Sequence, residues 1–349
     1  MREIIVVENE AGQRLDKLLH KILPNASTGF LYKMLRKKNI VWNGKKADGS
    51  EKIKAGDSIR LFLSEETFEK FAGKNEDKRE WESYERAYRE LAGIWILYEN
   101  EHVLFLHKPA GLLSQKAQPK DLSANEWMNG YLLSCNRISA VPGQERRPGF
   151  HPSICNRLDR NTSGIVICGT SPAGSREMNR LIRERSVRKF YRLFVKGRIQ
   201  GSDRLTGFLQ KDAETNRVAL LNQAQYDRLS ESEKKAYGPV ETGYRSISNG
   251  FLEGVGEISL LEAELVTGKT HQIRAHFASI GHPLVGDYKY GDRQLNAFFR
   301  EKFGVTSQLL HAYRLEFPVL EAPFLDLSGK QITDPVPEVF ERIMEGAGI

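Results

Sequence analysis

Residues 151–164 read His-Pro-Ser-Ile-Cys-Asn-Arg-Leu-Asp-Arg-Asn-Thr-Ser-Gly and lead into the apolar run Ile165 to Cys168. The run predicts a buried strand, and the Asn-Thr-Ser-Gly before it predicts a tight turn. Asp159 lies between Arg157 and Arg160, whose charges favour its ionised form. A fixed carboxylate on such a turn could act as a nucleophile or general base. The alternative is a solvated turn with a surface ion pair, which the composition of ordinary turns favours.

Residues 156–164 resemble the signature of the RluA-type pseudouridine synthases, H-R-L-D-x-x-T-S-G. Further segments resemble other elements of this family in the same order: K-P-x-G at 108–111, K-x-Y at 189–191, T-G-R-T-H-Q-I-R at 267–274 and G-H-P-x-x-G-D at 281–287. Asn156 departs from the pattern, because the family usually has His there. This difference puts in question the local packing or a substrate contact at this position, and not the chemistry of the reaction.

The resemblance implies an α+β fold, with a mixed central sheet and flanking helices, that isomerises uridines in RNA. It implies no cofactor and no metal. It makes Asp159 the essential carboxylate and Tyr191 a ring on which the target base can stack. It places Arg274 beside Asp159, where a bidentate guanidinium could hold the carboxylate. Residues expected to bind substrate are Arg157, Arg160, Lys189 and His271.

The N-terminal region carries two amphipathic helical patterns, at 15–22 and 27–35, followed by short strand patterns up to Leu63. This order resembles the small RNA-binding domain first recognised in ribosomal protein S-four. The basic residues of its second helix, which could bind phosphates or form a solvated face, are Lys33, Arg36, Lys37 and Lys38. We therefore predict an S-four-like domain at 1–63, a charged linker or exposed helix at 64–90, and a catalytic domain at 91–349.

The catalytic region shows strand and helix patterns without regular alternation, which favours a mixed α+β sheet over a doubly wound fold. Arg146 and Arg147, in a loop at 136–149, could touch RNA or face water. Strands are expected at 94–98, 103–106, 189–197, 240–247 and 257–265. Helices are expected at 121–134 and from 172, and a loop leading into a helix at 267–280. Residues 220–237 are expected to form a polar helical excursion.

Composition limits the class of protein. The 349 residues carry a net charge of +7, which favours a polyanionic partner such as RNA. No signal-peptide core and no membrane-length apolar stretch occurs, so we expect a cytoplasmic protein without membrane contact, and a monomer. The three cysteines form no C-x-x-C pair, which disfavours disulfides and a cysteine-based zinc site.

Several other kinds of site are disfavoured. The G-K-T at 268–270 lacks the earlier glycine of a phosphate loop, because that position is Ala263. His271 and His276 have no acidic partner at metal-binding spacing. Tyr191 could instead be a core residue, and Arg274 a surface residue.

The sequence therefore predicts an RNA pseudouridine synthase, most similar to the RluC and RluD kind that acts on large-subunit (23S) ribosomal RNA. Transfer RNA is an alternative substrate. A non-catalytic RNA-binding ribosome-assembly factor is an alternative of another class. A hydrolytic glycosidase is disfavoured because it would normally need two carboxylates.

Overall fold

The computed structural model describes residues 1–6, 10–72, 74–138, 150–212 and 217–349. Arg146 and Arg147 lie outside the described residues. Contacts divide the chain into two compact units: residues 1–92, 125–153 and 169–175 form one, and residues 93–124, 154–168 and 176–349 form the other. This grouping differs from a division at 64–90, and the domain boundaries at 63 and 91 stay a prediction.

The first unit begins with a small antiparallel sheet and two helices. The strands lie in the order β1 (Arg2–Ile5), β4 (Ser58–Leu61), β2 (Ile40–Trp42) and β3 (Lys45–Lys46). Helices α1 (Leu15–Ile22) and α2 (Thr28–Arg36) each bury one apolar stripe against a common core, as the helical spacing predicted. Ser27 caps α2, since its hydroxyl accepts a hydrogen bond from the Phe30 amide at 3.2 Å.

The charged segment after this sheet is helical and packs on a later part of the chain. It forms α3 (Glu65–Phe71) and α4 (Lys74–Glu90), and Tyr88 of α4 contacts Trp127 of α5 (Ala124–Ser134). A Cβ on Gly130 would lie 2.3 Å from the Tyr84 carbonyl oxygen, so α5 needs glycine where α4 approaches. The C-terminal part of α4 is therefore held by the unit that contains it rather than acting as a free linker.

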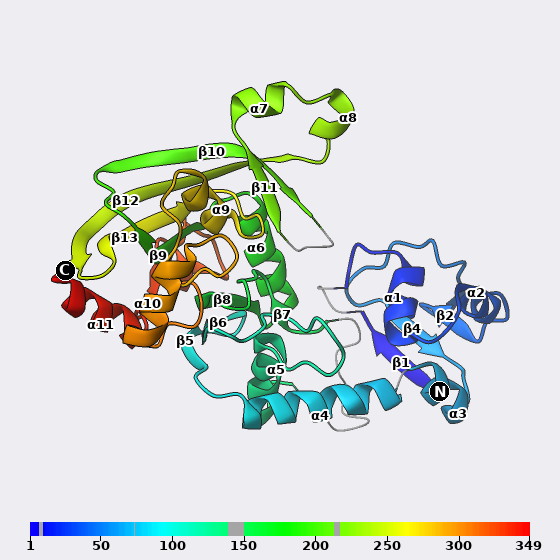
Figure 1. The fold of residues 1–349 in the computed structure, drawn as a ribbon. Coiled ribbons are helices and arrows are strands. Elements are labelled where there is room, and N and C mark those ends of the chain that lie inside the picture. The colour runs from blue at the N-terminus through cyan, green and yellow to red at the C-terminus, as the bar shows by residue number, and fades with distance from the viewer. Residues whose placement is uncertain (7–9, 73, 139–149, 213–216) are drawn as a thin grey trace. The chain divides into compact units, whose positions relative to one another are not determined.

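The second unit is organised by a large mixed sheet of 11 strands (Figure 1). The mixed sheet confirms the predicted α+β class: β14 is parallel to β8 but antiparallel to β9. Its main path runs β11 (Val218–Leu221), β10 (Ser202–Lys211), β12 (Gly238–Leu252), β13 (Gly256–Leu265), β9 (Arg188–Lys196), β14 (Leu310–Glu316), β8 (Ser163–Gly169), β6 (Val103–Lys108) and β5 (Trp95–Glu99), with β15 (Gln331–Thr333) beside β14 and β7 (Ser153–Ile154) beside β8.

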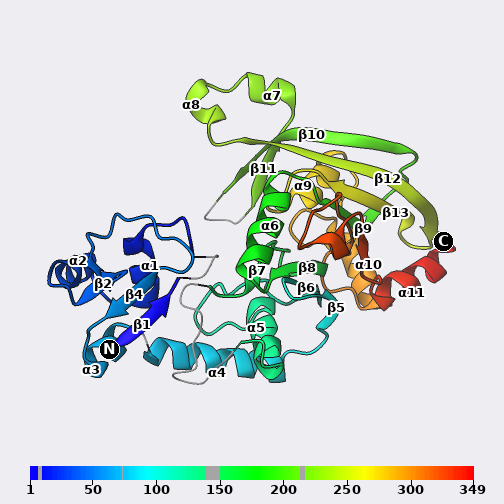
Figure 2. The ribbon, with the colours of Figure 1, turned by 180° about the vertical axis from the view of Figure 1, so that it is seen from behind.

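Helices cover parts of both faces of this sheet. Helix α9 (Gln272–Ser279) packs on β10, β11 and β12, and the view from behind shows it below β10 (Figure 2). The predicted polar excursion contains α7 (Gln223–Asp227) and α8 (Glu231–Lys234). The remaining helices are α6 (Pro172–Arg183), α10 (Arg293–Phe303), the short 3₁₀ helix η1 (Leu325–Leu327) and α11 (Glu338–Ala347).

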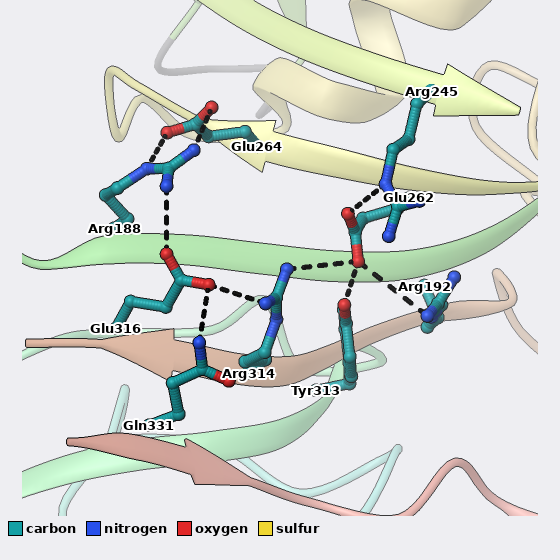
Figure 3. Close-up of polar contacts among 9 residues, drawn as sticks. All are labelled: Arg188, Arg192, Arg245, Glu262, Glu264, Tyr313, Arg314, Glu316 and Gln331. Atoms are coloured by element: carbon teal, nitrogen blue, oxygen red, sulfur yellow. Dashed lines mark hydrogen bonds and ion pairs between the residues drawn. The ribbon is translucent and has the colours of Figure 1, made fainter.

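One face of the sheet carries a continuous network of arginines and glutamates (Figure 3). Glu262, with a side chain 5% exposed, accepts hydrogen bonds from Arg245, Arg314 and the Tyr313 hydroxyl. Arg188 forms ion pairs with Glu264 at 2.8 Å and Glu316 at 2.9 Å. Because successive side chains of a strand point to opposite faces, Arg192 lies on this face and Tyr191 on the other. Within the described residues, no helix is long and apolar enough to cross a membrane.

Candidate active site

A cleft of about 1050 Å³ opens in the second unit, on the Tyr191 face of the sheet. Asp159 is the one carboxylate among the described residues that line it. Nine cationic residues surround that carboxylate in the same lining: Lys116, Arg157, Arg160, Lys189, Lys211, Arg217, Lys269, Arg274 and Lys289. This charge balance fits a polyanionic substrate, and the single acid gives no support to a two-carboxylate glycosidase.

The turn that carries Asp159 is held on both sides. The Ser114 hydroxyl donates to the Leu158 carbonyl at 2.9 Å and accepts from the Leu158 amide at 3.0 Å. On the other side, the Arg160 carbonyl accepts from the Gly111 amide at 2.9 Å and from the Lys108 ammonium at 3.1 Å. The backbone around the carboxylate is therefore fixed by the 108–114 segment, while the Asp159 side chain remains 24% exposed to the cleft.

Lys108 is a buried cation behind this turn. Its Nζ donates to the carbonyls of Pro109, Leu112 and Arg160 at 3.0, 2.8 and 3.1 Å, which uses all three of its N–H groups. Burial lowers the pKa of Lys108 to about 7, and the negative charge of Asp159 opposes that shift. The K-P-x-G segment thus supplies a hydrogen-bonding anchor as well as a chain reversal.

The strand after the turn passes very close to β14. Gly164 has φ +118°, and a Cβ there would lie 2.3 Å from the Ala312 carbonyl oxygen. Only glycine fits this close approach and this backbone conformation. The glycine of the signature is therefore explained by the parallel pairing of β8 with β14.

Arg274 lies beside Asp159, as predicted, but its bidentate partner is a different residue. Its Nη1 contacts Asp159 Oδ2 at 3.1 Å, whereas Nε and Nη2 bind the two oxygens of Asp287 at 2.7 and 2.9 Å. The expectation that the guanidinium would bind Asp159 with two hydrogen bonds is thus wrong. Burial raises the pKa of Asp287, but the ion pair with Arg274 outweighs burial and holds it below its ordinary value. Asp287 therefore orients the arginine that reaches Asp159.

Tyr191 and Lys189 project from β9 into the cleft wall. The Tyr191 ring is 6% exposed, and burial, assisted by the charge of Asp159, raises the pKa of its hydroxyl. Burial, with a smaller effect from Arg185, lowers the pKa of Lys189. Both side chains line the cleft, and stacking of a flipped base on Tyr191 stays a prediction.

His271, another predicted residue, also lies near the Asp159 carboxylate. Its Nε2 lies 3.8 Å from Asp159 Oδ2, and its Nδ1 lies 2.9 Å from the Tyr290 hydroxyl. Burial lowers the pKa of His271 to about 4, while Asp159 acts in the opposite direction. The ring is therefore neutral at pH 7.

The remaining predicted residues fall in two places. Arg157 and Arg160 are exposed and line the cleft, and Arg160 Nε donates to the Gly111 carbonyl at 2.9 Å. Asn156, at the position where the motif usually has His, accepts from the Ile167 amide at 2.7 Å and so braces β8. The basic residues predicted to bind phosphates are exposed on or just after α2 of the first unit: Lys33, Arg36, Lys37 and Lys38.

Sequence reasoning missed four residues that organise the site: Lys108, Ser114, Asp287 and Tyr290. Lys108 and Asp287 stood inside quoted motifs, and a buried lysine or aspartate in a motif is a signal for an anchoring role. Ser114 and Tyr290 act through long-range hydrogen bonds that no local pattern reveals. In the described part of the chain, no three His, Cys, Asp or Glu side chains cluster in a way that could hold a metal ion.

Comparisons with known proteins identify the family. The family described as RNA pseudouridylate synthase matches residues 102–279. The chain is 30% identical to "Ribosomal large subunit pseudouridine synthase C" of Vibrio cholerae, over 90% of this chain and 88% of the relative. It is 29% identical to the protein of the same name from Vibrio parahaemolyticus, over 97% and 94%.

A solved structure supports the fold. "Human RNA Pseudouridylate Synthase Domain Containing 4" aligns with a TM-score of 0.53 at 17% identity, covering 77% of this chain and 98% of that one. The resemblance that the motifs indicated is confirmed by the family match and by the Vibrio relatives. The chain belongs to the RNA pseudouridylate synthase family.

Proposed function

We propose that this protein converts uridine to pseudouridine in large-subunit ribosomal RNA, with Asp159 as the essential carboxylate. The bond from ribose to uracil nitrogen 1 is broken, the base turns, and carbon 5 is joined to the ribose. The carbon-5 hydrogen leaves to water as a proton, and nitrogen 1 takes up a proton from water, so the product is an isomer of uridine. The observation that carries the proposal is the cleft lining: among the described residues it holds one carboxylate, Asp159, which Arg274 contacts, and nine cationic residues. The names of the Vibrio relatives support the ribosomal substrate.

The proposed division of labour follows from position. Asp159 acts as the nucleophile or the base, Arg274 orients it, and Tyr191 supports the flipped base. Arg157, Arg160 and Lys189 contact the substrate from the cleft wall. The S-four-like region, through Lys33, Arg36, Lys37 and Lys38, adds affinity for the backbone without reading sequence. A cytoplasmic monomer that needs no cofactor completes the proposal.

The test is release of tritium from RNA labelled at carbon 5 of uridine and taken from cells that lack the gene. We expect release from large-subunit ribosomal RNA with the wild type and none with Asp159→Asn. A matched control is Asp203→Asn, which removes an exposed carboxylate at the start of β10 and should release tritium normally. Release only from transfer RNA would correct the substrate. No release from either RNA, with RNA binding retained, would refute the enzyme and favour the assembly factor.

A further inference from the structure

Each ring nitrogen of His271 has a defined neighbour. Nδ1 lies 2.9 Å from the Tyr290 hydroxyl, and Nε2 faces Asp159 Oδ2 at 3.8 Å. The Tyr290 oxygen also accepts a hydrogen bond from the Val218 amide at 2.9 Å. The ring is therefore held from one side while its other nitrogen faces the predicted catalytic carboxylate.

These neighbours decide which nitrogen carries the hydrogen. A neutral histidine has one N–H, and burial keeps this one neutral at pH 7. A lone pair on Nε2 would face the carboxylate of Asp159, which electrostatics disfavours, whereas an N–H there is attracted to it. The Tyr290 hydrogen is then free to point at Nδ1, since the Val218 amide occupies only a lone pair of its oxygen. The arrangement therefore favours the Nε2–H tautomer.

Among the described residues, that N–H has no acceptor within hydrogen-bond distance. At 3.8 Å, Asp159 Oδ2 is beyond hydrogen-bond distance. His271 lines the cleft, and its backbone is held at φ +56°, a conformation that non-glycine residues rarely adopt. Such a conformation persists when the surroundings impose it, as they often do at functional positions.

Tyr290 is itself fixed by the residue that orients Arg274. Asp287 Oδ1 accepts from the Tyr290 amide at 3.1 Å and from the Lys289 amide at 2.8 Å. The Arg274 guanidinium lies 5.2 Å from the centre of the Tyr290 ring. Tyr290 thus joins His271 to the same rigid group that supports Asp159.

We propose that the His271 Nε2–H donates a hydrogen bond to an oxygen of the uridine bound beside Asp159, and that Tyr290 is the positioning residue that orients it. This inference rests on the proposed function and adds to it a fixed donor for the target nucleotide. We assign the oxygen to the base or the ribose, because the cations that line the cleft are suited to bind the phosphates.

The test compares single-turnover tritium release and RNA affinity for Tyr290→Phe, His271→Leu, His271→Gln and the double variant Tyr290→Phe/His271→Leu. We expect Tyr290→Phe to slow release about tenfold with unchanged affinity, the loss of one well-oriented hydrogen bond. His271→Leu should slow it at least as much, and the double variant should be no slower than His271→Leu alone. Glutamine carries an amide N–H near the position of Nε2, so His271→Gln should recover part of the rate.

A matched control is Tyr98→Phe. It removes a hydroxyl on β5 that donates a hydrogen bond to Asp326 on η1. It should release tritium at the wild-type rate. A direct readout is the nitrogen-15 NMR spectrum of the His271 ring in the free protein, where we expect hydrogen on Nε2 and none on Nδ1.

The outcomes separate this inference from the function on which it rests. A wild type that releases no tritium overturns the proposed function. An active wild type with an equally active Tyr290→Phe, or additive losses in the double variant, overturns only the role of Tyr290. Hydrogen on Nδ1 overturns the donor assignment whatever the rates are.

Discussion

His276 makes the protein lose stability in acid by an amount that can be worked from its surroundings. The residue lies on α9 and is buried, which lowers its pKa from 6.5 to about 4. Thr242 Oγ1 accepts a hydrogen bond from Gln272 Nε2 at 3.0 Å and lies 2.8 Å from His276 Nδ1. The other ring nitrogen of His276, Nε2, is buried and has no hydrogen-bond partner among the described residues.

The sign of the effect follows from the depressed pKa. Between pH 6.5 and pH 4 the unfolded chain binds a proton at this histidine and the folded chain does not, so stability falls as the pH falls. Between pH 7.5 and 4.5 the loss from His276 is about 2.5 kcal/mol. Burial likewise lowers the pKa values of His271 and His311 to about 4, so each adds an acid-dependent loss that a change at His276 leaves in place.

The perturbation is His276→Leu, and the assay is urea unfolding of the second unit at pH 7.5 and 4.5. At pH 7.5 we expect the free energy of unfolding to change by no more than about 1 kcal/mol, because the lost hydrogen bond to Thr242 is offset by removal of an unsatisfied buried ring nitrogen. When the pH is lowered from 7.5 to 4.5, the free energy of unfolding of the variant should fall by about 2.5 kcal/mol less than that of the wild type. His282→Gln, at a half-buried histidine of the same unit, should behave like the wild type. Equal acid losses in His276→Leu and wild type would refute the reasoning.

Three further substitutions test the site and its support. Asp287→Asn keeps the size of the side chain but removes the charge that Arg274 binds twice; we expect tritium release to slow at least tenfold with RNA affinity retained. Glu262→Gln leaves the arginines around it uncompensated, and urea unfolding should show a loss of about 1–3 kcal/mol. Gly164→Ala forces a Cβ to 2.3 Å from the Ala312 carbonyl, so we expect a loss above about 3 kcal/mol or failure to fold, seen by circular dichroism.

Each of these has an outcome that contradicts it. Wild-type release from Asp287→Asn would mean that Arg274 needs no second anchor. Unchanged unfolding of Glu262→Gln would mean that solvent compensates the arginines. Gly201→Ala separates the two effects at Gly164, because Gly201 has φ +72° but open space at its Cβ position. A loss at Gly201 as large as that at Gly164 would show that backbone strain, rather than the close approach of β14, is the cause.

Much of the fold could be predicted because it follows local rules. The leucine spacing of α1, the Ser27 cap of α2 and the apolar run of β8 are each specified by a few neighbouring residues. The strand β10 was not predicted, since its exposed polar residues at 202–204 mask the alternation that its pairing with β12 requires. Long antiparallel pairing is set by the partner strand, which no local pattern contains.

The site was predictable only where a motif named its residues. Asp159, Tyr191 and Arg274 were found through resemblance, and the structure gathers them on one cleft. The second partner of Arg274 could not be predicted, because a guanidinium between two carboxylates takes the better geometry, and that depends on tertiary placement. The anchoring of the turn by Lys108 could not be predicted either, because its partners are main-chain carbonyls, which every residue carries.

The parallel pairing of β8 with β14 determines when activity can appear during synthesis. The turn at Asp159 leads directly into β8, whose neighbour β14 begins about 150 residues later in the chain. A nascent polypeptide that has passed the turn therefore still lacks the strand against which Gly164 packs. Domains generally complete their folding as units during translation. The newly made chain should thus stay inactive toward nearby RNA until residues 310–316 have left the ribosome.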